Sequence, residues 1–146
     1  MTLDQLDQDD INTYLKGMCK QLMYKRNMRN ITLAADTGWL NQFEHKPAVY
    51  ILFNKRKNRL VYVGETVNLR RRMRDLRNRH SVRKRIREEI FKVSQRPFPP
   101  NMKKKVTNYI EKHLKLSFWY VELGRIELEE WILEKLKPEF NIIGNK

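Results

Sequence analysis

Two short apolar segments near the middle of the chain limit its fold more than any other feature. Residues 48–53 and 60–63 are rich in β-branched and aromatic side chains, and a polar, basic stretch at 54–59 separates them. This pattern predicts a β-hairpin. Side chains alternate between the two faces of a sheet. Tyr50 and Tyr62 can therefore face each other if the two residue numbers of each cross-strand pair add up to an even number.

Helical signals surround this hairpin. Apolar residues recur at three- and four-residue steps, which predicts helices over about 10–28, 68–79, 82–93, 102–114 and 126–137. Residues 116–123 are the best candidate for a third strand, whereas 30–46 lack a sustained period and are interpreted as a linker. With 146 residues, of which 40% are hydrophobic, we expect one core. We divide the chain into an N-terminal helical extension and linker (1–46) and a main domain (47–146).

The charge is strongly basic and unevenly placed. The formal net charge is +14, and residues 51–100 carry sixteen Lys and Arg against four Asp and Glu. Such a stripe favours nucleic acid as the partner, although anionic membranes and solvated charged helices give similar counts. Cys19 is the single cysteine, which excludes an internal disulfide. The sequence shows neither a secretory signal nor a membrane-spanning apolar run, so we expect a cytoplasmic, nucleoid-associated location and no membrane partner.

Glu129 stands out among the glutamates of the last predicted helix. It shares its face with Ile132 and Leu136, so its carboxylate should be carried toward the apolar side of the domain. An unpaired buried carboxylate costs several kcal/mol and must be neutralised, ion-paired or bound to a metal. A structural salt bridge to an arginine such as Arg72 and a metal-ligand role both satisfy this requirement.

Several short motifs follow one another along the chain, namely Ala48-Val49-Tyr50, Tyr62-Val63-Gly64, Asn68–Arg72, Glu129 with Pro138, and Asn141. Taken in this order, they resemble the GIY-YIG nuclease family, particularly its UvrC-type members. The spacings agree as well, because Arg72 lies ten residues after Tyr62 and Asn141 twelve after Glu129. Each short motif alone is a weak signal, but four in the right order, each on the predicted element type, are a strong one. The resemblance covers roughly residues 47–146 and implies an α+β fold with a small three-stranded antiparallel sheet flanked by helices, here preceded by an N-terminal helix.

The resemblance also implies an activity, a metal-dependent DNA endonuclease that hydrolyses phosphodiester bonds. It implies that Tyr50 is the general base toward the attacking water and that Tyr62 shapes the hydrogen bonds of Tyr50. Arg72 would bind the scissile phosphate, Glu129 would hold one Mg²⁺ or Mn²⁺ per active site, and Asn141 would steady the site. A tyrosine titrates at about pH 10, so a basic role requires a nearby cation that favours the phenolate.

Several positions depart from the family pattern. Ala48 replaces the usual glycine, and Glu65 follows Gly64 where UvrC-type members carry a basic residue. Many members place a tyrosine or histidine one helical turn after the arginine, but Leu76 occupies that position here. His80 lies one further turn along and is therefore an alternative candidate for the base.

The segment between Arg72 and Glu129 is longer than in compact members and is rich in cations. We expect phosphate-backbone contacts from Arg70, Arg74, Arg77, Arg83, Lys84, Arg85, Arg87, Lys103, Lys104 and Lys105. Some of these side chains would instead be solvated helix faces. No separate DNA-binding domain fits, so specificity would come from the helices, a homodimer or a partner protein. A non-catalytic nucleic-acid-binding module, or a nuclease subunit active only in a complex, remains the alternative function.

Overall fold

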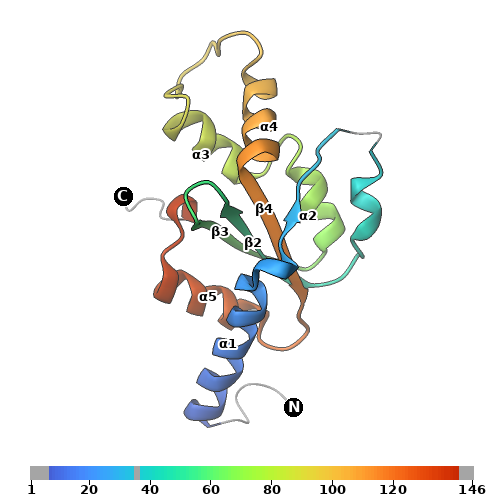
Figure 1. Cartoon of the computed structure of the whole chain (residues 1–146), viewed down its shortest axis with the longest axis vertical. Coiled ribbons are helices and arrows are strands. Elements are labelled where there is room, and N and C mark those ends of the chain that lie inside the picture. Colours follow the sequence, from blue (N-terminus) through green and yellow to red (C-terminus); the bar gives the residue numbers. More distant parts are fainter. Residues whose placement is uncertain (1–6, 35–36, 142–146) are drawn as a thin grey trace.

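The computed structural model describes residues 7–34 and 37–141 (Figure 1). Its main elements are α1 (Gln8–Met23), β1 (Arg29–Asn30), β2 (Ala48–Asn54), β3 (Arg59–Thr66), α2 (Leu69–Asp75), α3 (Ser81–Glu89), α4 (Met102–His113), β4 (Leu114–Tyr120) and α5 (Arg125–Leu136). Short 3-10 turns lie at Lys25–Asn27, Trp39–Gln42 and Glu139–Asn141. In the part of the chain described here, no helix is both long and apolar enough to cross a membrane.

All five predicted helices exist, but several end earlier than periodicity suggests. The N-cap of α1 is Asp7, whose side chain accepts a hydrogen bond from the Asp10 N–H. The helix α2 starts after Asn68, whose side chain caps it by accepting from the Arg71 N–H, and it ends at Asp75. The following turn carries the chain to His80, which caps α3. Because α2 ends at Asp75, Arg77 lies outside the helix that carries Arg70 and Arg74.

The sheet has four strands in the order β1-β4-β2-β3, and every neighbouring pair is antiparallel (Figure 1). The expected number was three. The additional strand, β1, pairs Arg29 with Leu116 and Asn30 with Lys115. Two residues are too few to produce a detectable alternation, which explains why the sequence did not reveal it.

The pairing of β2 with β3 sets the positions of the two tyrosines. Tyr50 lies opposite Gly64 and Leu52 opposite Tyr62, so the tyrosines are diagonal neighbours on one face. Their rings are stacked, with centroids 5.9 Å apart and planes inclined by 25°. The register shifts after Leu52, which leaves Val61 without a partner of its own. Such a bulge re-aims neighbouring side chains, and it keeps Tyr62 on the face of Tyr50.

Gly64 is required by the ring that lies across it. A Cβ atom at this position would come within 2.5 Å of Tyr50 Cζ and 2.6 Å of its hydroxyl oxygen. Real Cβ atoms essentially never approach so closely. The glycine of the second motif therefore provides the space that the tyrosine of the first motif occupies.

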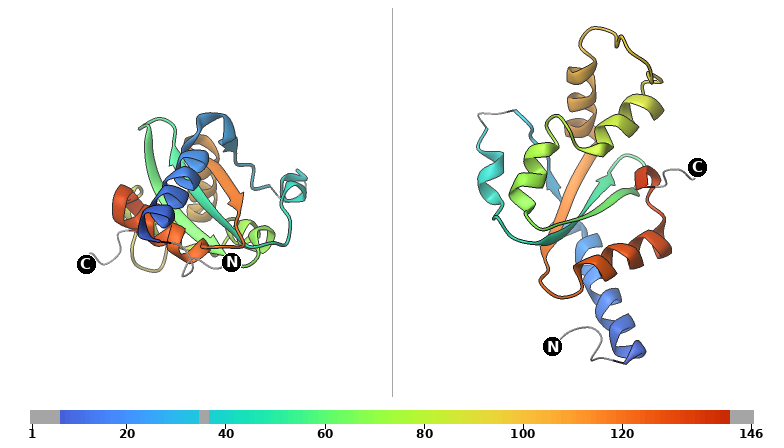
Figure 2. Two further views of the ribbon diagram at one scale, coloured as in Figure 1. Left: turned by 90° about the horizontal axis from the view of Figure 1, so that it is seen from below. Right: turned by 180° about the vertical axis from the view of Figure 1, so that it is seen from behind.

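Helices cover both faces of the sheet. The face carrying Tyr50 and Leu52 packs against α2, α3 and α4, and also against Ile31, Leu33, Trp39, Leu40 and Phe43. The opposite face packs against α1 and α5 through Leu22, Leu128 and Ile132. Figure 2 shows α1 and α5 side by side, and Figure 1 shows α3, α4 and their joining loop at one end of the molecule. The central strand β2 is buried along its whole length.

Candidate active site

The hydroxyl group of Tyr50 lies at the centre of a buried polar cluster. Tyr50 is 0% exposed, and its oxygen lies 2.6 Å from His80 Nε2. Arg72 donates to the same oxygen from Nε at 3.2 Å. Tyr62 completes the group, because its ring centroid is 4.8 Å from that of His80. The structure thus brings Tyr50, Tyr62, Arg72 and His80 together from two strands, one helix and one turn.

The role of His80 follows from its two ring nitrogens. Nδ1 accepts a hydrogen bond from the Val82 N–H at 3.0 Å, which caps α3. A neutral imidazole with Nδ1 as acceptor carries its proton on Nε2, so His80 donates to Tyr50. Burial, together with the charges of Arg72 and Arg83, lowers the pKa of His80 to about 3. His80 is therefore neutral at physiological pH and has no free lone pair to offer as a base.

The surroundings of Tyr50 do not fit the role of base toward water. Burial raises its pKa well above the ordinary value, the neighbouring Tyr62 raises it further, and Arg72 only partly opposes this. Its hydroxyl is buried away from solvent and already accepts two N–H groups. Tyr62 lies on the same face but is partly exposed. The partly exposed phenol, not the buried one, is placed to meet a water molecule.

Arg72 links this cluster to the protein surface. Burial lowers its pKa, but Tyr50 and Tyr62 outweigh burial and raise it. Its Nη1 lies 3.6 Å from Asp75 Oδ2, one turn along α2. The carboxylate beside Arg72 thus belongs to Asp75, and the alternative of a salt bridge between Arg72 and Glu129 is not realised. The only sequence signal for this contact was the three-residue spacing between Arg72 and Asp75 on one helix.

Asn141 and Glu129 both lie at the free edge of β3. The Asn141 side chain accepts from the Val63 N–H at 2.8 Å and donates to the Val63 carbonyl at 2.9 Å. Two residues further along, the Glu65 N–H lies near the Glu129 carboxylate and favours its charged form. Neighbouring residues on one strand edge thus lie beside the amide and the carboxylate. Tyr62 stands on the same strand, so β3 organises the whole site.

The electrostatics around Glu129 fit a bound cation. Burial raises its pKa, and the Glu65 carboxylate raises it further. Among residues 7–34 and 37–141, Glu129 has no ion-pair partner, since Arg125 pairs with Glu65 instead. The same ranges contain no group of three or more His, Cys, Asp or Glu that could enclose a metal. A cation at Glu129 would therefore take most of its ligands from water and substrate, as Mg²⁺ commonly does.

Arg125 is a residue that sequence reasoning missed. Its Nε donates to Glu65 Oε2, and it lies four residues before Glu129 on α5. Arg125 thus places a cation beside Glu65 from another element. The spacing of four residues on one helix was the available signal, because residues at that spacing share a face.

The predicted phosphate contacts differ in their availability. Arg83 is 6% exposed, and its guanidinium donates to the Leu76 and Lys103 carbonyls and to Thr107 Oγ1. The expectation of a backbone contact from Arg83 is therefore corrected, because its donors already tie α2, α3 and α4 together. Other members of the predicted set are tied to protein groups, namely Arg70 to Asn41, Arg85 to Glu89 and Arg87 to the Val93 carbonyl. The exposed members are Arg74, Lys84, Lys103, Lys104 and Lys105, while Arg77 is half-buried.

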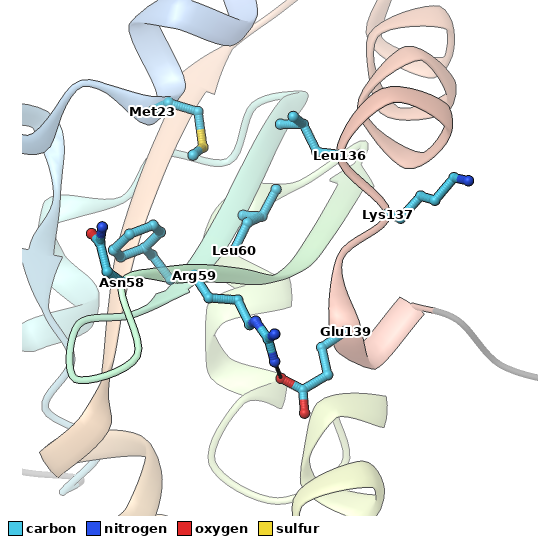
Figure 3. A pocket seen from close by; sticks show the side chains of 8 residues that line it. Met23, Asn58, Arg59, Leu60, Leu136, Lys137 and Glu139 are labelled. Carbon is cyan, nitrogen blue, oxygen red and sulfur yellow. Dashed lines mark hydrogen bonds and ion pairs between the residues drawn. The ribbon is translucent and has the colours of Figure 1, made fainter.

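A cavity of about 500 Å³ lies away from these side chains, at the turn of the hairpin (Figure 3). Phe53 and Leu60 line it from the face that packs on α1 and α5, and Met23 and Leu136 add further apolar surface. The Arg59–Glu139 ion pair, at 3.3 Å, lies at its polar side. None of the predicted catalytic residues lines it, so this cavity is not the candidate active site.

Comparison with known families gives a decisive match, in which residues 46–141 correspond to the GIY-YIG catalytic domain. The chain belongs to the GIY-YIG family. Its GIY-YIG domain is a catalytic endonuclease domain, as the motifs indicated. A search among curated proteins finds no match.

The GIY-YIG domain is also similar to solved structures of the N-terminal endonuclease domain of UvrC from Thermotoga maritima. The magnesium-bound form is 18% identical, with a TM-score of 0.46, and the match covers 70% of this chain and 90% of that one. A tyrosine-to-phenylalanine variant bound to its catalytic divalent cation is 19% identical, with a TM-score of 0.44 and the same coverage. An asparagine-to-alanine variant is 18% identical, with a TM-score of 0.43, covering 69% and 88%.

Proposed function

We propose that this GIY-YIG domain is a DNA endonuclease that hydrolyses phosphodiester bonds with the help of one divalent cation, Mg²⁺ or Mn²⁺. The supporting observation is the arrangement around β3. Tyr62 and Arg72 lie together on one face of this strand, while Glu129 and Asn141 are held at its free edge. The strongly basic composition supports a nucleic-acid substrate. Such an enzyme would act in the cytoplasm at the nucleoid.

We assign the general base to Tyr62 in place of Tyr50. Tyr62 is partly exposed, and its phenol interacts with the guanidinium of Arg72, the proposed phosphate-binding group. Tyr50 and His80 then serve as positioning residues. His80 orients the Tyr50 oxygen, and this oxygen in turn holds Nε of Arg72. The buried pair thereby fixes the direction of the guanidinium without touching the substrate.

Arg72 would bind the scissile phosphate with the N–H groups that Tyr50 does not occupy. A guanidinium presents several donors in a fixed plane, which suits the oxygens of a phosphate. Because the guanidinium is already in position before the reaction, it stabilises the negative charge that develops on these oxygens. Asp75 lies beside the same guanidinium and keeps it from swinging into solvent before substrate arrives.

Glu129 would hold the divalent cation, and the adjacent Glu65 adds negative charge that attracts it. A bound divalent cation would act as a Lewis acid that stabilises charge on the phosphate and the leaving oxygen. Asn141 keeps the edge of β3 from pairing with another strand, so that the cation site stays open.

The direct test is incubation of the purified chain with supercoiled plasmid, with and without Mg²⁺ or Mn²⁺. We expect nicked or linear product only with metal. Glu129→Gln should abolish cleavage while preserving the fold and DNA affinity, since it removes the anionic ligand but little volume. Glu130→Gln, on the exposed side of the same helix, should cleave like the parent.

Equal loss in both glutamine variants would show that the metal site is misplaced. DNA binding by the parent without cleavage would support a non-catalytic binding module instead. Cleavage that appears only when a second protein is added would identify a subunit that works in a complex.

A further inference from the structure

A small cavity between α3 and α4 has an unusual concentration of positive charge. It measures about 250 Å³, and its walls include Arg83, Arg87, Arg96 and Lys103 together with Asn78 and Phe98. No carboxylate is among the residues that line it. Four cations around one small space repel one another, and a bound anion would relieve this repulsion.

The guanidinium groups in this cavity are held in place. Arg87 stacks over the Phe98 ring at 4.2 Å from its centroid, and Arg96 lies over the same ring at 5.0 Å. Arg87 also donates from Nε to the Val93 carbonyl. Its nearest carboxylate is Glu88, at 3.9 Å from Nη2. Aromatic stacking on Phe98 therefore holds both guanidinium groups in place at the cavity.

The cavity lies close to the catalytic cluster in the fold. Asn78 and Arg83 come just before and after His80, which contacts Tyr50. Arg83 also donates to the Leu76 carbonyl at the end of α2, the helix that carries Arg72. Because α3 and α4 pack on the same face of the sheet as Tyr50, the cavity and the catalytic cluster lie on the same side of the sheet.

We propose that this cavity is a second phosphate-binding site, which holds a phosphodiester group of the DNA backbone beyond the scissile bond. The inference rests on the proposed DNA substrate and assigns the helices inserted between Arg72 and Glu129 a part in binding it. Arg96 and Lys103, both exposed, would contact the phosphate directly. Arg83 supports the wall, since its donors are engaged within the protein. Arg87 is held over Phe98 and adds to the positive potential.

The test uses the full chain in EDTA, so that DNA binding is measured without cleavage. The double variant Arg96→Gln/Lys103→Gln is compared with Lys16→Gln/Lys20→Gln, which removes the same charge from the exposed side of α1 on the opposite face. Duplex affinity is measured over a series of salt concentrations. We expect the cavity variant alone to flatten the plot of log affinity against log salt, by about 0.9 for each phosphate that is no longer neutralised. Equal slopes for the two double variants would overturn the proposal.

Two further measurements separate the remaining alternatives. If inorganic phosphate competes with duplex for the parent at an equal phosphate concentration, the site accepts free phosphate and the assignment to the DNA backbone is overturned. In plasmid cleavage, the cavity variant should raise KM severalfold and leave kcat unchanged. A lower kcat with unchanged KM would show that these residues act in the reaction itself, and would overturn their role as a binding site beyond the scissile bond. A parent that binds DNA but never cleaves it would end the nuclease proposal, while a slope difference would still support this site.

Discussion

His80 Nε2 lies 2.6 Å from the hydroxyl oxygen of Tyr50, across thirty residues of sequence. Both side chains are almost completely buried, and the other nitrogen of His80 caps α3. One imidazole therefore connects the start of α3 with the central strand of the sheet. The contact stands next to Arg72, so it also determines how firmly the proposed phosphate-binding group is held.

The buried neutral state of His80 predicts a pH-dependent stability. In the unfolded chain the His80 imidazole binds a proton below about pH 6.5, whereas in the folded chain it stays neutral down to about pH 3. The free energy of unfolding should therefore fall as the pH drops through this window, by roughly 1 kcal/mol per pH unit from this group. His80→Asn keeps an N-cap acceptor but removes the imidazole, so its urea-unfolding free energy should vary less with pH. Parallel curves for parent and variant would contradict the assignment.

The two tyrosines should respond differently to loss of their hydroxyl groups. Tyr62→Phe should lower kcat by about 10²–10⁴-fold, as expected for loss of a general base, with stability close to that of the parent. Tyr50→Phe leaves the His80 N–H buried without an acceptor, so it should lower the free energy of unfolding by about 1–3 kcal/mol. Plasmid cleavage and urea unfolding measure the two effects. A fully active Tyr62→Phe beside an inactive but equally stable Tyr50→Phe would return the base to Tyr50.

Gly64→Ala should destabilise the protein through Tyr50. The added methyl group meets the phenol ring at 2.5 Å, and forced overpacking of this kind costs about 1–3 kcal/mol. In a Tyr50→Ala background the same substitution should cost far less, because the ring is gone. A double-mutant cycle measured by urea unfolding reports this coupling. Simple additivity of the two substitutions would show that the ring moves aside freely.

Arg72→Lys should damage catalysis more than its conservative nature suggests. A lysine ammonium cannot both donate to Tyr50 and present a planar pair of donors to a phosphate. We expect a loss of about 10²–10³-fold in kcat, comparable to the loss of one preorganised donor to a developing oxyanion. The matched control is Arg71→Lys, at the adjacent exposed position on the same helix. Similar activities in both variants would argue against Arg72 as the phosphate clamp.

The strongest periodic signals predicted the fold well. The hairpin of β2 and β3 and all five helices follow from β-rich apolar runs and helical spacing, and the family match confirms the family that the motif order indicated. The third strand, predicted at 116–123 from its apolar run, exists as β4 but begins and ends earlier, at Leu114–Tyr120. The two-residue strand β1 and the bulge at Val61 escaped notice because neither spans enough residues to create a pattern. Both depend on how strands meet, which local sequence does not encode.

The site was harder to anticipate because its key contacts are formed over long sequence separations. The approach of His80 to Tyr50 requires α2 to end at Asp75 and the next turn to fold back, whereas periodicity extended that helix to Arg79. Arg83 was expected to contact the phosphate backbone, yet three hydrogen bonds hold its guanidinium inside the protein, where charged side chains are rare. Residue type and spacing identify chemistry, but burial decides which group can perform it.

The residues that precede the family match contribute to both faces of the sheet. Leu15 and Leu22 of α1 complete one core, Ile31 and Phe43 complete the other, and β1 extends the sheet beyond β4. A gene fusion that carried over only residues 46–141 would leave apolar surface uncovered on each side. Recombination between proteins would therefore have to transfer the matched region together with the N-terminal segment. The part of the chain that buries its own core is longer than the part that carries the family motifs.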